Sequence, residues 1–116
     1  MNARVVIWVS EKDLKDILIT AVESGHLNYW AEFKNYDYKK GVVTVREHND
    51  ERDEKKRGPW IRVTPKTIAR GLRLCAKMPD DEGGWAFTTW LKDRIGDAAT
   101  ADNIFQFGVL KELKYG

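Results

Sequence analysis

The chain is poor in the residues that build metal centres, disulfide frameworks and membrane spans. Its 116 residues include one cysteine, Cys75, and two histidines, His26 and His48. One cysteine excludes an internal disulfide and a cysteine-rich metal cluster, and two histidines this far apart do not have the spacing of a zinc site. No apolar run approaches the roughly 20 residues that span a membrane, and charged residues follow the short apolar run at 5–9. We therefore expect a cytoplasmic protein with no cofactor, no metal and no membrane contact.

The sequence also lacks the short motifs of common enzymes. It contains no P-loop, no dinucleotide fingerprint, no metalloprotease helix motif and no nucleophile elbow. Cys75 falls on an apolar helical stripe, which favours a small buried side chain over a nucleophile. General acid–base chemistry would require His26 together with a carboxylate such as Glu23 or Asp102. Whether the protein is an enzyme stays open, with a non-catalytic role favoured.

The chain also lacks a large excess of charge of either sign, whereas tryptophan is abundant. Twenty basic against eighteen acidic residues give a net charge of +2, too little to indicate a nucleic-acid partner. Residues 49–57 contain no apolar side chain and mix both signs, which predicts an exposed charged loop over residues 49–58. Five tryptophans indicate an interface, or a pocket that stacks on a flat ligand, in addition to core packing.

Hydrophobic periodicity predicts one α+β domain over residues 1–116. Helices are expected from Ser10 to Gly25, after Thr64, over 85–95, and after Asp97 or Thr100. Strands are expected at 4–9, 27–36, 42–47 and 59–63, with a further short strand at 110–115. Because strands and helices do not alternate strictly, the pattern favours an antiparallel sheet of three or four strands, with three or four helices mainly on one face. Gly108 on the buried side of the last helix predicts close approach of another backbone.

The segment Asn28, Tyr29 and Trp30 is the strongest candidate for a binding site. In a strand, Tyr29 and Trp30 would point to opposite faces, so that one packs in the core and the other can stack on a ligand. Asn28 offers both a hydrogen-bond donor and an acceptor. The alternative, two aromatic side chains packing the two faces of a sheet, is equally compatible with the sequence.

Several short matches spread over the chain resemble a family of small, largely uncharacterised bacteriophage proteins. The matching residues are Ala21, Glu23, Gly25, Tyr29, Trp30, Thr67, Ile68, Gly71, Leu72, Asp97, Ala98, Ala101, Asp102, Gln106, Glu112, Tyr115 and Gly116. Ser24 and Lys111 stand where the family favours glycine. The resemblance implies a phage origin, action in the host cytoplasm and a role in host takeover or anti-defence. It implies no settled activity.

Three functions are compatible with these observations. The first is sequestration of a nucleotide-like small ligand in a pocket lined by Glu23, His26, Asn28, Tyr29, Trp30, Asp102 and Gln106. The second is inhibition of a host defence complex, such as a CRISPR complex, by protein–protein contact through residues 49–57 and the tryptophans Trp60, Trp85 and Trp90. The third is a small enzyme that uses His26 with a carboxylate. Homo-oligomerisation is left open.

Overall fold

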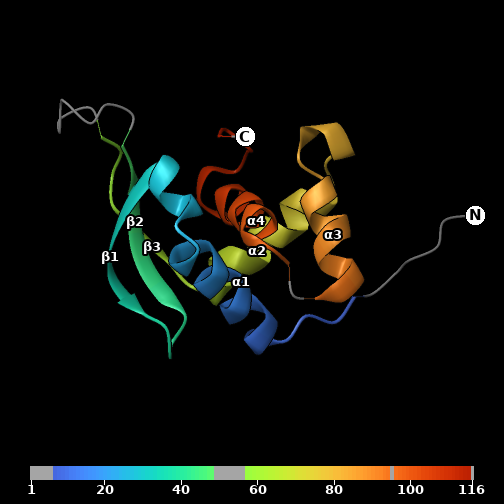
Figure 1. Cartoon of the computed structure of the whole chain (residues 1–116), viewed down its shortest axis with the longest axis horizontal. Coiled ribbons are helices and arrows are strands. Elements are labelled where there is room, and N and C mark those ends of the chain that lie inside the picture. Colours follow the sequence, from blue (N-terminus) through green and yellow to red (C-terminus); the bar gives the residue numbers. More distant parts are fainter. Residues whose placement is uncertain (1–6, 49–56, 95, 116) are drawn as a thin grey trace, which may run out of the picture.

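A three-stranded antiparallel sheet stands beside four α-helices in the computed structural model, which describes residues 7–48, 57–94 and 96–115 (Figure 1). The elements in chain order are α1 (Glu11–Glu23), the 3₁₀-helix η1 (His26–Tyr29), β1 (Ala31–Asp37), β2 (Val42–Glu47), β3 (Ile61–Val63), α2 (Pro65–Ala76), the 3₁₀-helix η3 (Asp80–Glu82), α3 (Trp85–Asp93) and α4 (Ala98–Leu110). The helices cover one face of the sheet. The predicted small α+β fold is confirmed.

The sheet has the order β1-β2-β3 and presents its apolar face to the helices. Val43 faces Val63 across the β2–β3 ladder, and Phe33 faces Val45 across the β1–β2 ladder. Val43, Val45 and Val63 are buried. Side chains alternate between faces along a strand, so the intervening polar residues lie on the outer face.

Helix α4 forms the centre of the molecule and packs against α1, α2 and α3 (Figure 1). Every residue from Ala101 to Gly108 is buried. A helix that is buried all round sits inside a core rather than on its surface. At its crossing with α2, Gly108 lies against Thr67 and Gly71 lies against Ile104 and Gly108. The close backbone approach predicted from Gly108 is thus confirmed.

The predicted helix starts are present in the structure. Ser10 accepts a hydrogen bond from the Asp13 amide, and the Asp13 carboxylate accepts one from the Ser10 amide, which closes a capping box. Thr64 caps α2, with Pro65 as its first residue. Of the two candidates for the last helix, Asp97 is the cap, because its carboxylate accepts a hydrogen bond from the Thr100 amide at 2.8 Å.

Three local predictions are wrong. Residues 7–9 form no strand, because the carbonyl of Trp8 accepts a hydrogen bond from Arg94 instead of pairing with the sheet; residues 4–6 lie outside the described part. Residues 111–115 form no strand, because Gln106 binds the backbone of Lys114 and Tyr115. Residues 26–29 form a 3₁₀-helix, so the strand predicted at 27–36 begins at Ala31.

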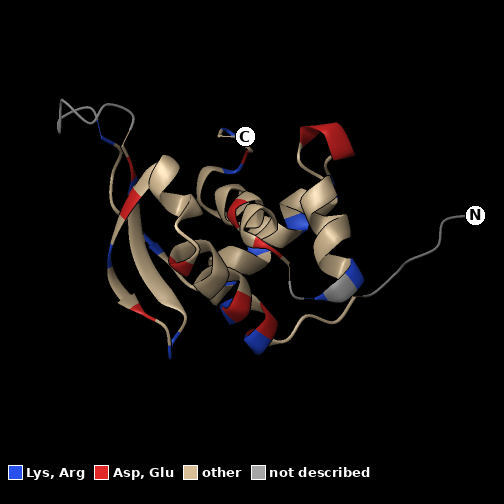
Figure 2. Ribbon diagram, viewed as in Figure 1, with Lys and Arg blue, Asp and Glu red and all other residues tan. Residues whose placement is uncertain are grey.

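Charged residues of both signs are spread over the helices and strands, with an acidic group on η3 (Figure 2). The predicted charged loop at 49–58 falls mostly outside the described residues. Its described end is tied to the sheet, since the Gly58 amide donates to the Glu47 carbonyl at 3.0 Å. None of the helices in the described ranges combines the length and apolar character that a membrane crossing requires.

Candidate functional site

A pocket of about 610 Å³ lies among η1, the start of α3, the first half of α4 and the C-terminal segment. Its walls are formed by His26, Tyr29, Trp30, Trp85, Ala99, Asp102, Asn103, Leu113 and Tyr115. The volume and the mixture of aromatic walls with a few polar groups are typical of small-molecule sites. Four of the predicted ligand-binding residues, His26, Tyr29, Trp30 and Asp102, meet in this one pocket.

The 3₁₀-helix η1 presents Tyr29 and Trp30 in opposite environments. Gly25 adopts φ 84° and ends α1, so the chain turns sharply instead of continuing into a strand. The amides of Asn28 and Trp30 donate to the carbonyls of Gly25 and Leu27, and Leu27 is fully buried. Tyr29 is consequently 84% exposed and Trp30 only 2%. We expected a strand to point Tyr29 and Trp30 to opposite sides, and a 3₁₀-helix does so instead.

Trp30 is buried in the core and also lines the pocket. Its indole Nε1 donates to Asp102 Oδ1 at 2.8 Å, and its ring stacks on Tyr115 with centroids 5.7 Å apart and planes 10° apart. The ring of Phe105 also packs against Trp30, with the two ring centroids 6.1 Å apart. Trp30 is therefore mainly a structural wall, whereas Tyr29 is the aromatic ring available at the pocket rim.

Asp102 is a buried carboxylate at the pocket wall. It is 8% exposed, and its two oxygens accept from Trp30 Nε1 and Gln106 Nε2, both at 2.8 Å. Burial raises the pKa of Asp102 above its ordinary range, while these two hydrogen bonds and the nearby His26 act in the opposite direction. Within the described residues no basic side chain forms an ion pair with it.

Gln106 builds the pocket wall rather than lining it. Its amide nitrogen donates to Asp102 and to the Tyr115 carbonyl at 2.7 Å, and its oxygen accepts from the amides of Lys114 and Tyr115. This fully used side chain holds the C-terminal segment across Trp30. Glu47 holds the same segment from β2, because it accepts from the Tyr115 hydroxyl at 2.5 Å and Lys114 Nζ at 3.0 Å.

Asn103, Trp85 and Tyr115 are pocket residues that we did not predict for the ligand site. Asn103 is 5% exposed, and its amide nitrogen has no hydrogen-bond acceptor in the described part of the chain. Trp90 Nε1 and Thr100 Oγ1 are also buried without a partner in the described part of the chain, and neither residue lines the pocket. Trp85, at the start of α3, is 36% exposed and faces the pocket from the side of the helices.

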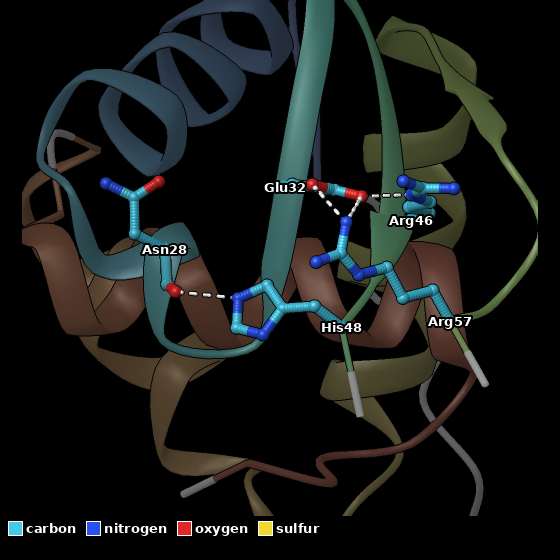
Figure 3. Close-up of polar contacts among 5 residues, drawn as sticks. All are labelled: Asn28, Glu32, Arg46, His48 and Arg57. Carbon is cyan, nitrogen blue, oxygen red and sulfur yellow. Dashed lines mark hydrogen bonds and ion pairs between the residues drawn. The ribbon is translucent and has the colours of Figure 1, made fainter. Parts of the chain in front are cut away.

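Besides Gln106, two predicted ligand-binding residues, Glu23 and Asn28, do not line the pocket. Glu23 accepts a hydrogen bond from the Tyr36 hydroxyl at 2.6 Å, which links α1 to β1. The backbone carbonyl of Asn28 lies 2.9 Å from His48 Nε2 (Figure 3), while the Asn28 side chain is exposed. Of the two carboxylates considered as partners of His26, Asp102 lines the same pocket and Glu23 does not.

The outer face of the sheet carries a separate polar network. Glu32 accepts hydrogen bonds from Arg46 and Arg57 (Figure 3). These bonds, with that from Arg46 the largest cause, hold the pKa of Glu32 below its ordinary range. Lys34 Nζ and the Arg46 guanidinium lie 4.1 and 4.4 Å from the ring centre of Trp60, as in cation–π contacts.

No group of three or more His, Cys, Asp or Glu side chains able to hold a metal is present among the described residues. Comparisons with known proteins found no family model, no curated protein and no solved structure that matches this chain. The site therefore has to be interpreted from its own geometry.

Proposed function

We propose that the protein is a non-catalytic binding protein that sequesters a nucleotide-like small ligand in the pocket beside η1. The observation that carries this proposal is the combination of an 84% exposed Tyr29 with the buried carboxylate of Asp102 in one pocket of about 610 Å³. An exposed ring offers a stacking surface, and the Asp102 carboxylate offers a hydrogen-bond acceptor to the edge of a planar ligand.

The resemblance to phage proteins suggests the use of such binding. A phage-encoded protein that withholds a nucleotide signal from a host defence system would need affinity but no turnover. The pocket walls are largely aromatic and carry few titratable groups. Apart from the tyrosines, these groups are His26 and Asp102. This composition supports binding more than acid–base chemistry.

The first experiment is native mass spectrometry of protein expressed in bacteria, followed by calorimetric titration with the 5′-monophosphates of the four common ribonucleosides. We expect either a retained mass of nucleotide size or saturable binding of at least one nucleotide. Absence of any added mass, together with no binding at millimolar nucleotide, would overturn the proposal.

The variant Tyr29→Ala tests the pocket itself. Because Tyr29 is exposed, its removal should leave the fold intact and cost about 1–3 kcal/mol of stacking, which is about fivefold to 150-fold in Kd. Tyr38→Ala is the matched control, since Tyr38 is 59% exposed in the β1–β2 turn and does not line the pocket. Equal binding by the two variants would contradict the proposed site.

A protein–protein inhibitor of a host defence complex is the second candidate. The observation in its favour is Trp60, exposed beside Lys34 and Arg46 on the outer face of the sheet; tryptophan and arginine are common anchors of interfaces. In an assay of CRISPR-complex cleavage, this function predicts that Trp60→Ala loses inhibition and that Tyr29→Ala keeps it.

A further inference from the structure

The pocket beside η1 combines aromatic walls with a carboxylate, and this combination narrows the charge of its ligand. Asp102 is the one carboxylate in the walls, and no lysine or arginine of the described residues lines the pocket. The identification of the ligand class rests on the proposed function, since it concerns the ligand of that same pocket.

The hydrogen bonds of Asp102 favour its ionised form. Its Oδ1 accepts from Trp30 Nε1 and its Oδ2 accepts from Gln106 Nε2, both at 2.8 Å. The Gln106 amide can be oriented in one way only, because its oxygen accepts from the amides of Lys114 and Tyr115. Each oxygen of Asp102 therefore faces an N–H donor, and such donors stabilise the charged carboxylate against the effect of burial.

No cation within the described residues balances this charge. Asp102 forms no ion pair there, although His26 lines the same pocket. Lys114 Nζ lies over the ring of Tyr115, 5.5 Å from its centre, but its charge is paired with Glu47 at 3.0 Å. A buried charge without a partner is unfavourable. A ligand that brings a positive charge into the pocket relieves this cost, and it can do so without touching the carboxylate, because charges interact over longer distances where water is scarce.

The aromatic walls favour the same sign of charge. The pocket is lined by four large aromatic side chains, Tyr29, Trp30, Trp85 and Tyr115. The face of an aromatic ring is negative, and cations bind over it, most strongly over tryptophan. Tyr29 and Trp85 are 84% and 36% exposed, so both leave ring surface open to a ligand. A flat ring that carries a positive charge can stack on these walls and is also attracted by Asp102.

We propose that the pocket takes a flat aromatic ring that carries a positive charge, which in a nucleotide means an N-alkylated base. Alkylation of a ring nitrogen supplies the charge and keeps the ring flat. The charged base enters among the aromatic side chains, and the phosphate stays outside, because no lysine or arginine in the described part of the chain lines the pocket to pair with it.

Calorimetric titration of the full chain with three forms of AMP tests this preference most directly. Methylation of ring N1 gives adenine a positive charge near neutral pH, whereas methylation of the exocyclic N6 adds the same group without the charge. We expect N1-methyl-AMP to bind about tenfold more tightly than both AMP and N6-methyl-AMP. A tenfold difference corresponds to about 1.4 kcal/mol, which lies within the range of a cation–π contact in a partly desolvated site.

The variant Asp102→Asn assigns the preference to the carboxylate. It should lower the affinity for N1-methyl-AMP and bring it closer to that for AMP. The matched control Asp80→Asn changes an exposed residue on η3 that does not line the pocket, and it should leave the ratio of the two affinities unchanged. Thermal melting identifies a variant that fails to fold. The comparison of the three nucleotides uses the wild-type protein, so it decides the proposal even in that case.

A second pair of ligands separates the positive charge from the nucleotide. Nicotinamide and 1-methylnicotinamide are flat rings without ribose or phosphate, and only the second is a cation. Binding of 1-methylnicotinamide in preference to nicotinamide, with no binding of any nucleotide, would support the cation site and overturn nucleotide sequestration. Equal affinity for the three forms of AMP would overturn the cation site and support sequestration. No binding of any of the five compounds would overturn both.

Discussion

The crossing of α2 and α4 gives the sharpest prediction about stability. A Cβ added at Gly71 would lie 2.3 Å from the Ile104 carbonyl oxygen and 2.7 Å from the Gly108 amide nitrogen. Ordinary contacts of a carbon atom begin at about 3.5 Å, so the first distance is short by roughly 1.2 Å. Both obstacles are backbone atoms of a central helix, and they cannot rotate away as a side chain could.

The substitution Gly71→Ala therefore sets two effects against each other. Alanine in a helix interior is favoured over glycine by about 1 kcal/mol. Overpacking a dense core costs about 1–3 kcal/mol and occasionally more, and a backbone overlap of this size belongs at the upper end. We expect a net loss of about 2 kcal/mol, which lowers the melting temperature by roughly 8 °C for a domain of this length.

The assay is thermal unfolding followed by circular dichroism, with chemical denaturation as a second measurement. Gly58→Ala is the control, because the nearest atoms to its added Cβ lie at ordinary contact distances of 3.5 Å and beyond, and its φ is not positive. Gly71→Ala with a melting temperature equal to or above that of the wild type would show that helix propensity outweighs the overlap. That result would refute the tight crossing of the two helices.

Three other substitutions or reactions test the surroundings of the site. The hydrogen bonds from Tyr115 and Lys114 outweigh the effect of burial and hold the pKa of Glu47 below its ordinary range. The resulting stabilisation of the folded state is present above the unfolded pKa and is lost as the pH falls through the folded pKa. The fall in melting temperature from pH 7 toward pH 3 should therefore be smaller in Glu47→Gln than in the wild type. Burial raises the pKa of Cys75 to about 11, so a thiol reagent at pH 7 should label it only after denaturation, and rapid labelling of the native protein would contradict its buried position. Asn103→Leu removes an unpaired buried donor and should raise the melting temperature of the ligand-free protein by roughly 4 °C, measured beside its nucleotide affinity.

The helices were predictable because their signals are local. Ser10 with Asp13, and Thr64 with Pro65, mark helix starts through bonds within one turn, and alternation gave the strand Val42–Glu47 with its observed limits. The β-branched residues near Trp8 gave a misleading signal. A strand needs a neighbour as well as a propensity, and the Trp8 carbonyl is bound by Arg94, 86 positions further along the chain.

The pocket was predictable in part, for a similar reason. Tyr29 could be chosen as one of two adjacent aromatic residues after a helix end, and Asp102 was chosen through the resemblance to phage proteins. Asn103 could not, because a periodic pattern with Ala101, Ile104 and Phe105 inside would place residue 103 outside. The structure buries α4 on every side, so its polar residues are inside as well. That fact depends on α1, α2 and α3 packing around it, and no short stretch of sequence contains it.

Helix α4 buries four polar side chains, Thr100, Asp102, Asn103 and Gln106, and the fold accounts for them to different degrees. Burying a polar group is unfavourable unless its hydrogen bonds are made. Gln106 makes all of its bonds and fixes the C-terminal segment, so its presence is explained by structure. Each oxygen of Asp102 accepts one hydrogen bond, whereas the Thr100 hydroxyl and the Asn103 amide nitrogen are buried without a hydrogen-bond partner in the described part of the chain. An unpaired buried atom alone does not mark the pocket, because Thr100 lies outside its walls. Asp102 is different, because it is a buried carboxylate with no basic partner in the described part of the chain, and burying such a group is unfavourable. Its position in the pocket wall is therefore an argument that the pocket binds a ligand.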